Sequence, residues 1–139
     1  MRISTDLVVL ATLLACGAQT SRVYAECVVL GQPTVQSRLY GSDLVFLADV
    51  LGVETVLEPD SFRYRVRFRV VEAYKGIGVG ERVIQFRPTT TDDFVFKVRQ
   101  RVLVYAYGSP GNESTQCTDT HVVSRAAADM RELRRLTRK

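Results

Sequence analysis

Histidine and cysteine are scarce in this chain of 139 residues, which contains one histidine, His121, and three cysteines. A metal site needs several ligands at short spacing, and neither residue type supplies such a group. The glycine-rich segment 76–80 also lacks the lysine and the serine or threonine that complete a phosphate-binding loop. His121 lies beside the strand-like pair Val122-Val123, where a surface or hydrogen-bonded role is expected. We therefore predict that the protein is not an enzyme and carries no cofactor.

Long apolar segments are also missing, because no run approaches the roughly twenty residues that span a bilayer, and we expect no transmembrane span. The apolar run from Leu7 to Ala15 lies within residues 1–25, which begin with the basic Arg2 and end with the small Ala25. This pattern resembles a secretory signal peptide that is cleaved after Ala25. We expect one exported domain, residues 26–139, that is secreted, periplasmic or extracellular.

The leader also permits a second interpretation, because Leu13-Leu14-Ala15-Cys16 looks like a bacterial lipobox. In that case Cys16 would be lipidated and would anchor the protein to the cell envelope. Under either interpretation Cys16 is not a free thiol, and Cys27 and Cys117 remain as a pair in an oxidising compartment. A bridge between them would close a loop of about ninety residues and add roughly 4 to 5 kcal/mol of stability. Two buried free thiols are the alternative.

Charge is nearly balanced in the exported part. Without Arg2, Arg22 and Asp6, it holds 17 basic and 14 acidic side chains, a net charge of +3. This mild excess does not indicate a nucleic-acid partner, and none is expected. The hydrophobic share of 46% favours a globular fold over disorder.

Apolar and charged residues alternate without a break from Phe62 to Val70, which predicts a half-buried strand. The side chains expected to face the core are Phe62, Tyr64, Val66, Phe68 and Val70. The opposite face would carry an arginine ladder, formed by Arg63, Arg65, Arg67 and Arg69. Arginine forks suit sulfate, phosphate and carboxylate groups, so the ladder is a candidate anion-binding surface. The alternative is that the neighbouring carboxylates pair with these arginines: Asp49, Glu54 and Glu58.

Further strands are expected at 44–54, with Gly52 as a bulge or bend, at 81–87, at 98–107 and around Cys117, ending near Val123. Five short strands separated by turns predict a small antiparallel barrel. A helical turn is expected at 34–40, and a final helix at 125–138 that Ser124 caps. One stripe of that helix is apolar and is expected to pack on the barrel: Ala126, Met130, Leu133 and Thr137. The opposite side is basic, with Arg131, Arg134, Arg135 and Arg138; contact of this helix with an anionic membrane is the alternative.

The succession of these elements resembles the netrin-like domain, whose best-known members are the tissue inhibitors of metalloproteinases. The resemblance rests on Ser42-Asp43-Leu44-Val45-Phe46 in the first strand, Phe68 to Gly76 in the second and Arg101 to Ala106 in the fourth. It also rests on Cys27 at the mature start and Cys117 in the last strand. It covers residues 26 to about 136 and implies a five-stranded Greek-key barrel of the oligonucleotide/oligosaccharide-binding type (OB-fold), followed by a helix.

The chain departs from the family at its start and would be a divergent, single-domain member. The animal inhibitors begin with Cys-x-Cys, and their first cysteine chelates the protease zinc through its amino group and carbonyl. Here Ala25 occupies that position and Glu26 would become the terminus, while Asp92-Asp93-Phe94 replaces the family's Cys-Gly. The animal mechanism is therefore in question, although the terminal amine or the Glu26 carboxylate could still reach a metal.

Two functions follow from these patterns. The resemblance implies a metalloendopeptidase inhibitor or docking domain, with a zinc metallopeptidase as partner. Its protease-contacting edge would comprise Glu26, Cys27, Val28, Glu58, Asp60, Asp92 and Asp93. The alternative is an envelope or extracellular interaction domain that binds an anionic glycan, lipid or protein through the arginine ladder.

Overall fold

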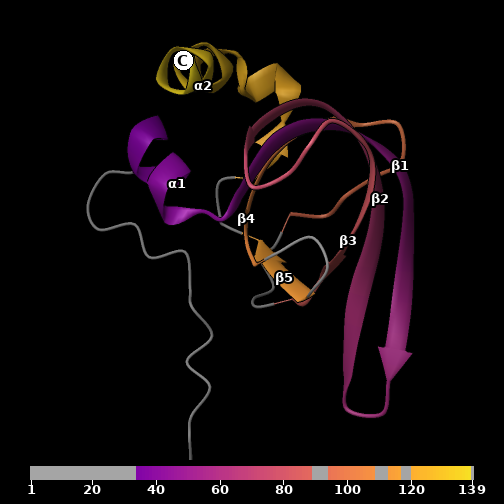
Figure 1. Cartoon of the computed structure of the whole chain (residues 1–139). Coiled ribbons are helices and arrows are strands. Elements are labelled where there is room, and N and C mark those ends of the chain that lie inside the picture. The colour runs from indigo at the N-terminus through magenta and orange to yellow at the C-terminus, as the bar shows by residue number, and fades with distance from the viewer. Residues whose placement is uncertain (1–33, 89–93, 109–112, 117–119, 139) are drawn as a thin grey trace, which may run out of the picture.

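The structure is a computed structural model that describes residues 34–88, 94–108, 113–116 and 120–138. It is mainly β, as expected, with a C-terminal helix at one end of the sheet (Figure 1). The elements in chain order are α1 (Val35–Gly41), β1 (Leu44–Glu58), β2 (Ser61–Lys75), β3 (Gly80–Phe86), β4 (Arg101–Tyr107), β5 (Glu113–Gln116), β6 (His121–Val122), the 3-10 turn η1 (Val123–Arg125) and α2 (Ala127–Thr137).

The strands form one sheet in the order β1-β2-β3-β5-β4-β6, and β1 also pairs with β4. The pairings therefore run from β1 through β2, β3, β5 and β4 back to β1, so the sheet closes on itself. All of these pairs are antiparallel except β3 and β5, which run parallel. Strands β1 and β2 have fifteen residues each. Strand β1 extends beyond its pairing with β4, and β2 extends beyond its pairing with β3.

Strand β1 pairs with a neighbour on each of its two edges and bends where one of these pairings ends. Its first part, Leu44 to Asp49, pairs with β4, and the segment from Val45 to Glu58 pairs with β2. The register with β2 shifts between Val50 and Gly52, which confirms the bulge or bend expected at this glycine. A bulge increases local twist and turns a strand away from its previous course, so β1 leaves the closed part of the sheet here.

Two apolar cores lie on the two sides of β1 and β4. Side chains at alternate positions, such as Phe46 and Val104, point into the closed sheet, where the rings of Phe46 and Phe68 meet edge to face at 5.3 Å. The intervening positions, such as Val45 and Tyr105, pack beneath the helices together with Leu133 of α2. Because both faces are covered, these strands read as continuous apolar runs rather than alternating ones.

Helix α1 confirms the helical turn expected at 34–40. Thr34 is its N-cap and accepts a hydrogen bond from the Ser37 backbone N–H at 3.1 Å, and the Ser37 hydroxyl accepts one from the Thr34 N–H at 2.9 Å. This reciprocal pair satisfies two N–H groups that a helix start leaves open. At the other end, the Lys75 ammonium donates to the carbonyl oxygens of Leu39, Tyr40 and Ser42 at 3.0, 3.2 and 2.6 Å.

Several boundaries differ from the expectation, and the largest difference is in β1, which continues to Glu58 where an end at residue 54 was expected. Strand β4 begins at Arg101 rather than residue 98, because Arg99 adopts a left-handed φ of 71° in a turn closed by the Gln100 N–H and the Lys97 carbonyl. Ser124 does not cap the final helix: it lies in η1, and α2 begins after Ala126 with no side-chain cap. The strand expected around Cys117 is represented by β5 and β6, and Cys117 itself lies outside the described residues.

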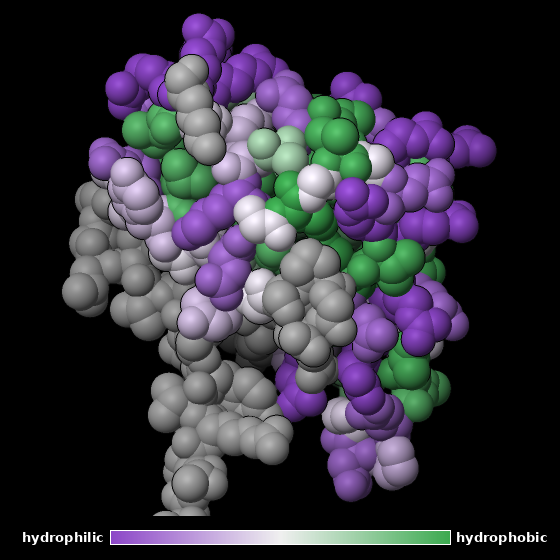
Figure 2. All heavy atoms as spheres, in the orientation of Figure 1, coloured by the Kyte–Doolittle hydropathy of each residue, from purple (hydrophilic) through white to green (hydrophobic). Residues whose placement is uncertain are grey.

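The apolar stripe expected on the final helix is confirmed for Ala126, Met130 and Leu133, whereas Thr137 is half-buried and its hydroxyl donates to the Leu133 carbonyl. Ala126 and Leu133 are fully buried, and Met130 and Leu136 pack partly buried against the same core. The arginines at 131, 134, 135 and 138 are exposed, so α2 turns a basic surface to solvent. Figure 2 shows hydrophilic residues over α2 and along the outer side of the long strands.

Candidate functional site

The β1–β2 hairpin projects past the rest of the sheet. Pairing of β4 with β1 ends at Asp49, and pairing of β3 with β2 begins at Tyr64, which lies opposite Thr55, so the segment from Val56 to Arg63 has two strands only. A tight turn at Pro59-Asp60 joins Glu58 to its partner Ser61. In Figure 1 the tip of this hairpin lies at the end of the molecule opposite α2.

One face of the hairpin tip is apolar and open to solvent. Leu57 and Phe62 face each other across the strands, with 82% and 41% of their surfaces exposed. The Phe62 ring also meets the Tyr64 ring edge to face at 5.4 Å. The prediction that Phe62 faces the core is wrong, although Val66, Phe68 and Val70 are buried as expected. Alternation places Phe62 on the correct face, but none of the described strands or helices covers that face at the tip.

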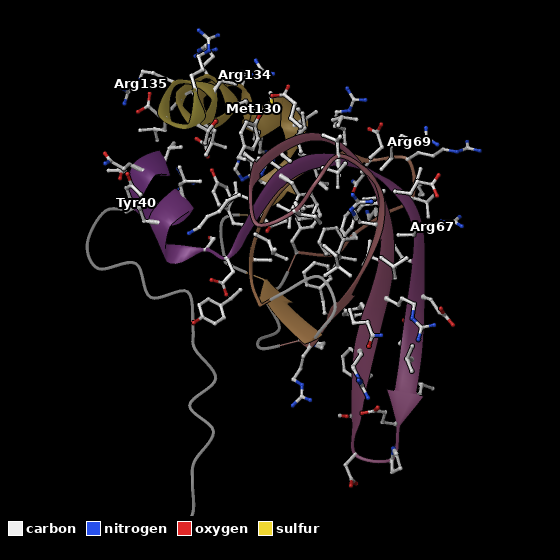
Figure 3. All side chains as sticks on the ribbon, in the orientation of Figure 1. Tyr40, Arg67, Arg69, Met130, Arg134 and Arg135 are labelled. Atoms are coloured by element: carbon white, nitrogen blue, oxygen red, sulfur yellow. The ribbon has the colours of Figure 1, made fainter. Side chains whose placement is uncertain are left out.

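The other face carries the arginine ladder, and carboxylates pair with most of it. Arg63 pairs with Glu58, Arg65 pairs with Glu54 at 3.2 Å, and Arg69 lies 3.7 Å from Glu81. The Ser61 hydroxyl also donates to Glu58 at 3.0 Å. This confirms pairing by Glu54 and Glu58, the alternative to an open anion site. Figure 3 shows Arg67 and Arg69 extending outward from the strands.

Asp49 pairs with β4 instead of the ladder. The Arg101 guanidinium donates to its two carboxylate oxygens at 2.7 and 2.9 Å. These hydrogen bonds, and then the charges of Arg101 and Arg69, hold the pKa of Asp49 below its ordinary value despite partial burial. Carboxylates therefore offset the charge of most arginines in the ladder. Arg67 is the exception, because the residue opposite it on β1 is the uncharged Gly52.

Only part of the expected protease-contacting edge is described. Glu58 ends β1 and is held by Arg63, while Asp60 is exposed in the hairpin turn. The remaining members of that edge lie outside the described residues: Glu26, Cys27, Val28, Asp92 and Asp93. Cys16 and Cys117 also lie outside them, so the lipidation and disulfide predictions stay predictions.

A polar cluster joins the two helices to the sheet. Asp129 of α2 forms an ion pair with Arg38 of α1 at 3.2 Å and accepts a hydrogen bond from the Tyr105 hydroxyl at 3.3 Å. The Arg38 guanidinium lies 5.4 Å from the centre of the Tyr105 ring, and His121 Nε2 lies 4.0 Å from the same carboxylate. The sequence did not reveal this cluster, because its members come from four elements separated along the chain.

A second ionic contact ties α2 to β2. The Arg134 guanidinium binds the Glu72 carboxylate, with one donor–acceptor distance of 2.9 Å. This hydrogen bond holds the pKa of Glu72 below its ordinary value. Burial, followed by the hydrogen bond that its hydroxyl donates to Glu72, raises the pKa of Tyr74 to about 12. Figure 3 shows Arg134 and Arg135 on α2.

The described part of the chain contains no group of three or more histidine, cysteine, aspartate or glutamate side chains placed to hold a metal ion. None of the helices described is both long and apolar enough to cross a membrane. Comparison of the chain with protein-family models and with curated proteins finds no match. The hairpin, with its apolar and ionic faces, is therefore the candidate site that the geometry itself defines.

Proposed function

We propose that the chain is an exported, non-enzymatic binding module that docks a protein partner through the tip of its β1–β2 hairpin. The observation that carries the proposal is the exposed pair Leu57 and Phe62 on a projection that no other described element covers. Protein interfaces have an apolar centre, a polar rim and anchors that are often aromatic. The hairpin tip supplies an apolar centre with the aromatic anchor Phe62, while the Glu58–Arg63 ion pair lies on the opposite face.

The fold type we propose is the OB-fold of netrin-like domains. Its support is the ring of pairings through β1, β2, β3, β5 and β4, in which only β3 and β5 run parallel. The positions of the three resembling segments are consistent with this proposal: they lie at the start of β1, at the end of β2 and along β4. A helix follows the last strand, as the resemblance implies.

The resemblance makes a zinc metalloendopeptidase the proposed class of partner. Without a Cys-x-Cys start, the chain would rely on contacts around the active-site cleft more than on zinc chelation. A two-stranded projection suits that task, since its backbone hydrogen bonds and the Glu54–Arg65 and Glu58–Arg63 ion pairs hold its shape before binding. Docking inhibits the protease only if the hairpin blocks the cleft, so binding and inhibition are measured separately.

The test uses residues 26–139 with an authentic Glu26 terminus and a panel of zinc metalloendopeptidases. Binding is measured by biolayer interferometry and inhibition by peptide hydrolysis. We expect the double variant Leu57→Ser and Phe62→Ser to bind at least tenfold more weakly than wild type. Val79→Ser removes another exposed apolar side chain, away from the hairpin tip, and should bind like wild type. Circular dichroism of each variant separates lost contacts from lost folding.

Two results would contradict the proposal. The first is equal binding by wild type and the folded double variant, because the hairpin tip would then play no part. The second is the absence of binding to every protease in the panel, which would remove the metallopeptidase from the proposal.

The alternative function, an anionic partner on the arginine ladder, predicts salt-dependent binding that the double variant Arg65→Ser and Arg67→Ser weakens. The geometry favours it less, because carboxylates already pair with most of the ladder.

Export and the disulfide are part of the same proposal. Intact-mass spectrometry of the protein produced by its host tests both in one measurement. A chain that begins at Glu26 supports signal-peptide cleavage, whereas a chain that begins at an acylated Cys16 supports the lipid-anchored form. The loss of two hydrogens relative to the reduced mass supports a bridge between Cys27 and Cys117, and two reactive thiols would refute it.

A further inference from the structure

The arginine ladder has one position without a carboxylate neighbour. In the register of the three strands, Arg65 lies beside Glu54 of β1, and Arg69 lies between Asp49 of β1 and Glu81 of β3. Arg67 lies instead between Gly52 and Val83, neither of which is charged. Among the described residues, no carboxylate forms an ion pair with Arg67. The outer face therefore presents one uncompensated guanidinium in an otherwise paired row.

The same position is hollow. A pocket of about 330 Å³ opens on this face, and its walls are formed by Gly52, Val53, Glu54, Arg65, Arg67 and Val83. The missing side chain of Gly52 creates part of this space, since a Cβ there would lie 3.8 Å from Nη2 of Arg67. Val83 contributes an apolar wall that is 47% exposed. The hollow thus combines the unpaired Arg67 guanidinium and the Glu54–Arg65 ion pair with the apolar surface of Val83.

We infer that the Arg67 hollow binds a single carboxylate group that carries a small apolar substituent. The planar guanidinium matches a carboxylate through two parallel hydrogen bonds, and Val83, which lies opposite Arg67 on β3, can cover the substituent. Glu54 on the rim disfavours ligands with several negative charges, because like charges at short range repel. The hollow lies on the face opposite Leu57 and Phe62, so this site is separate from the proposed docking surface. Two sources share the required chemistry: the C-terminus of a peptide and a free branched-chain acid.

The experiment is an NMR titration of the side-chain Nε–H signals of arginine in residues 26–139, at constant ionic strength. The probes are 4-methylpentanoate, its neutral amide, and the dipeptide acetyl-Ala-Leu as free acid and as C-terminal amide. We expect the Arg67 signal, assigned by its loss in Arg67→Gln, to shift saturably with the two acids and not with the amides. At least tenfold tighter binding of the dipeptide acid identifies a peptide C-terminus as the source. Equal affinities identify a free acid.

Gly52 provides a matched pair of variants that leaves Arg67 in place. Gly52→Asp would supply the missing carboxylate from within the chain, and we expect it to abolish binding of both acids. Gly52→Asn adds nearly the same volume without charge and should retain more of the binding than Gly52→Asp. Equal loss in both variants would show that volume alone matters and would overturn the charge argument.

Other outcomes would overturn the inference as a whole. One is the absence of a saturable Arg67 shift with either acid. Another is a sulfated heparin tetrasaccharide that binds at least tenfold more tightly than the acids and shifts all four ladder arginines together, since that pattern describes a polyanion surface. Because the titration needs no protease, its result is independent of the proposed docking function.

Discussion

Gly76 closes the end of β2 in a conformation that we expect only glycine to hold. Its φ is +73°, and a Cβ on this residue would lie 2.1 Å from the carbonyl oxygen of Asp43. The left-handed backbone costs an L-residue about 1 to 2 kcal/mol. Moving Asp43 would also strain two hydrogen bonds: the one that its N–H donates to Ala106 at 2.9 Å, and the one that its carboxylate accepts from the Gly108 N–H at 2.9 Å. At about 1 kcal/mol for each bond, Gly76→Ala should lower the free energy of unfolding by roughly 3 to 4 kcal/mol.

Urea unfolding followed by circular dichroism measures this loss. With a slope of about 1.5 kcal/mol per molar urea, a loss of about 3 kcal/mol lowers the midpoint by about 2 M. Gly41→Ala is the matched control, because a Cβ added to Gly41 at the end of α1 would meet no atom of a distant residue within 4 Å, and this variant should unfold like wild type or slightly later. Asparagine tolerates the left-handed φ, but the Cβ of Gly76→Asn would still lie too close to the Asp43 carbonyl oxygen. This variant should therefore retain most of the loss in the free energy of unfolding. A midpoint within about 0.5 M of wild type for Gly76→Ala would refute the reasoning.

Three further predictions concern the contacts that hold the helices and β4. Lys75→Met removes the donor to three carbonyls at the end of α1 and should cost about 2 kcal/mol in urea unfolding; an unchanged midpoint would contradict it. Thr120→Val keeps the shape but removes a buried hydroxyl that bonds both the N–H and the carbonyl of Tyr105 at 3.1 and 3.0 Å. It should therefore cost about 2 kcal/mol, and a neutral effect would count against those bonds. The hydrogen bond from Arg134 lowers the pKa of Glu72 from 4.5. The stability that this ion pair contributes is therefore present above pH 4.5 and is lost as the pH falls through the folded-state pKa. The loss of stability in Glu72→Gln should therefore shrink in acid, whereas a difference that does not change with pH would exclude the ion pair as its cause.

Strand β2 was predictable because its pattern is local. Alternation from Phe62 to Val70 identifies a strand and assigns each side chain to a face, and the burial of Val66 and Phe68 follows. Alternation does not say where the covering elements end. The face of Phe62 was therefore predicted correctly but its burial was not, since β3 pairs with β2 only from Tyr64 onward.

The sequence predicted that carboxylates pair with the arginine ladder, but not which residue of β1 lies opposite each arginine. Acidic residues in β1 indicated pairing across the strands, and Glu54 and Glu58 do pair with arginines. The place of Arg67 depends on the register shift between Val50 and Gly52, which sets the uncharged Gly52 opposite it. Nothing in the local pattern fixes the position of such a shift, so the hollow could be found only in the folded chain.

The polar cluster around Asp129 could not be predicted from local sequence patterns. Its partners Arg38, Tyr105 and His121 come from α1, β4 and β6, and only the closure of the sheet brings them together. The start of α2 was missed for a related reason. Ser124 is a good cap by type, but the chain forms a 3-10 turn there and buries Ala126 against the sheet before the helix begins.

Hydrogen–deuterium exchange of the protein bound to a metalloendopeptidase tests docking by the hairpin most directly, because it reports the contact surface without a mutation. We predict that amides from Val53 to Tyr64 exchange more slowly in the complex than in the free protein, while those of α2 keep their free rates. Protection confined to α2 or to the strands of the closed sheet, with unchanged exchange at the hairpin tip, would contradict the account.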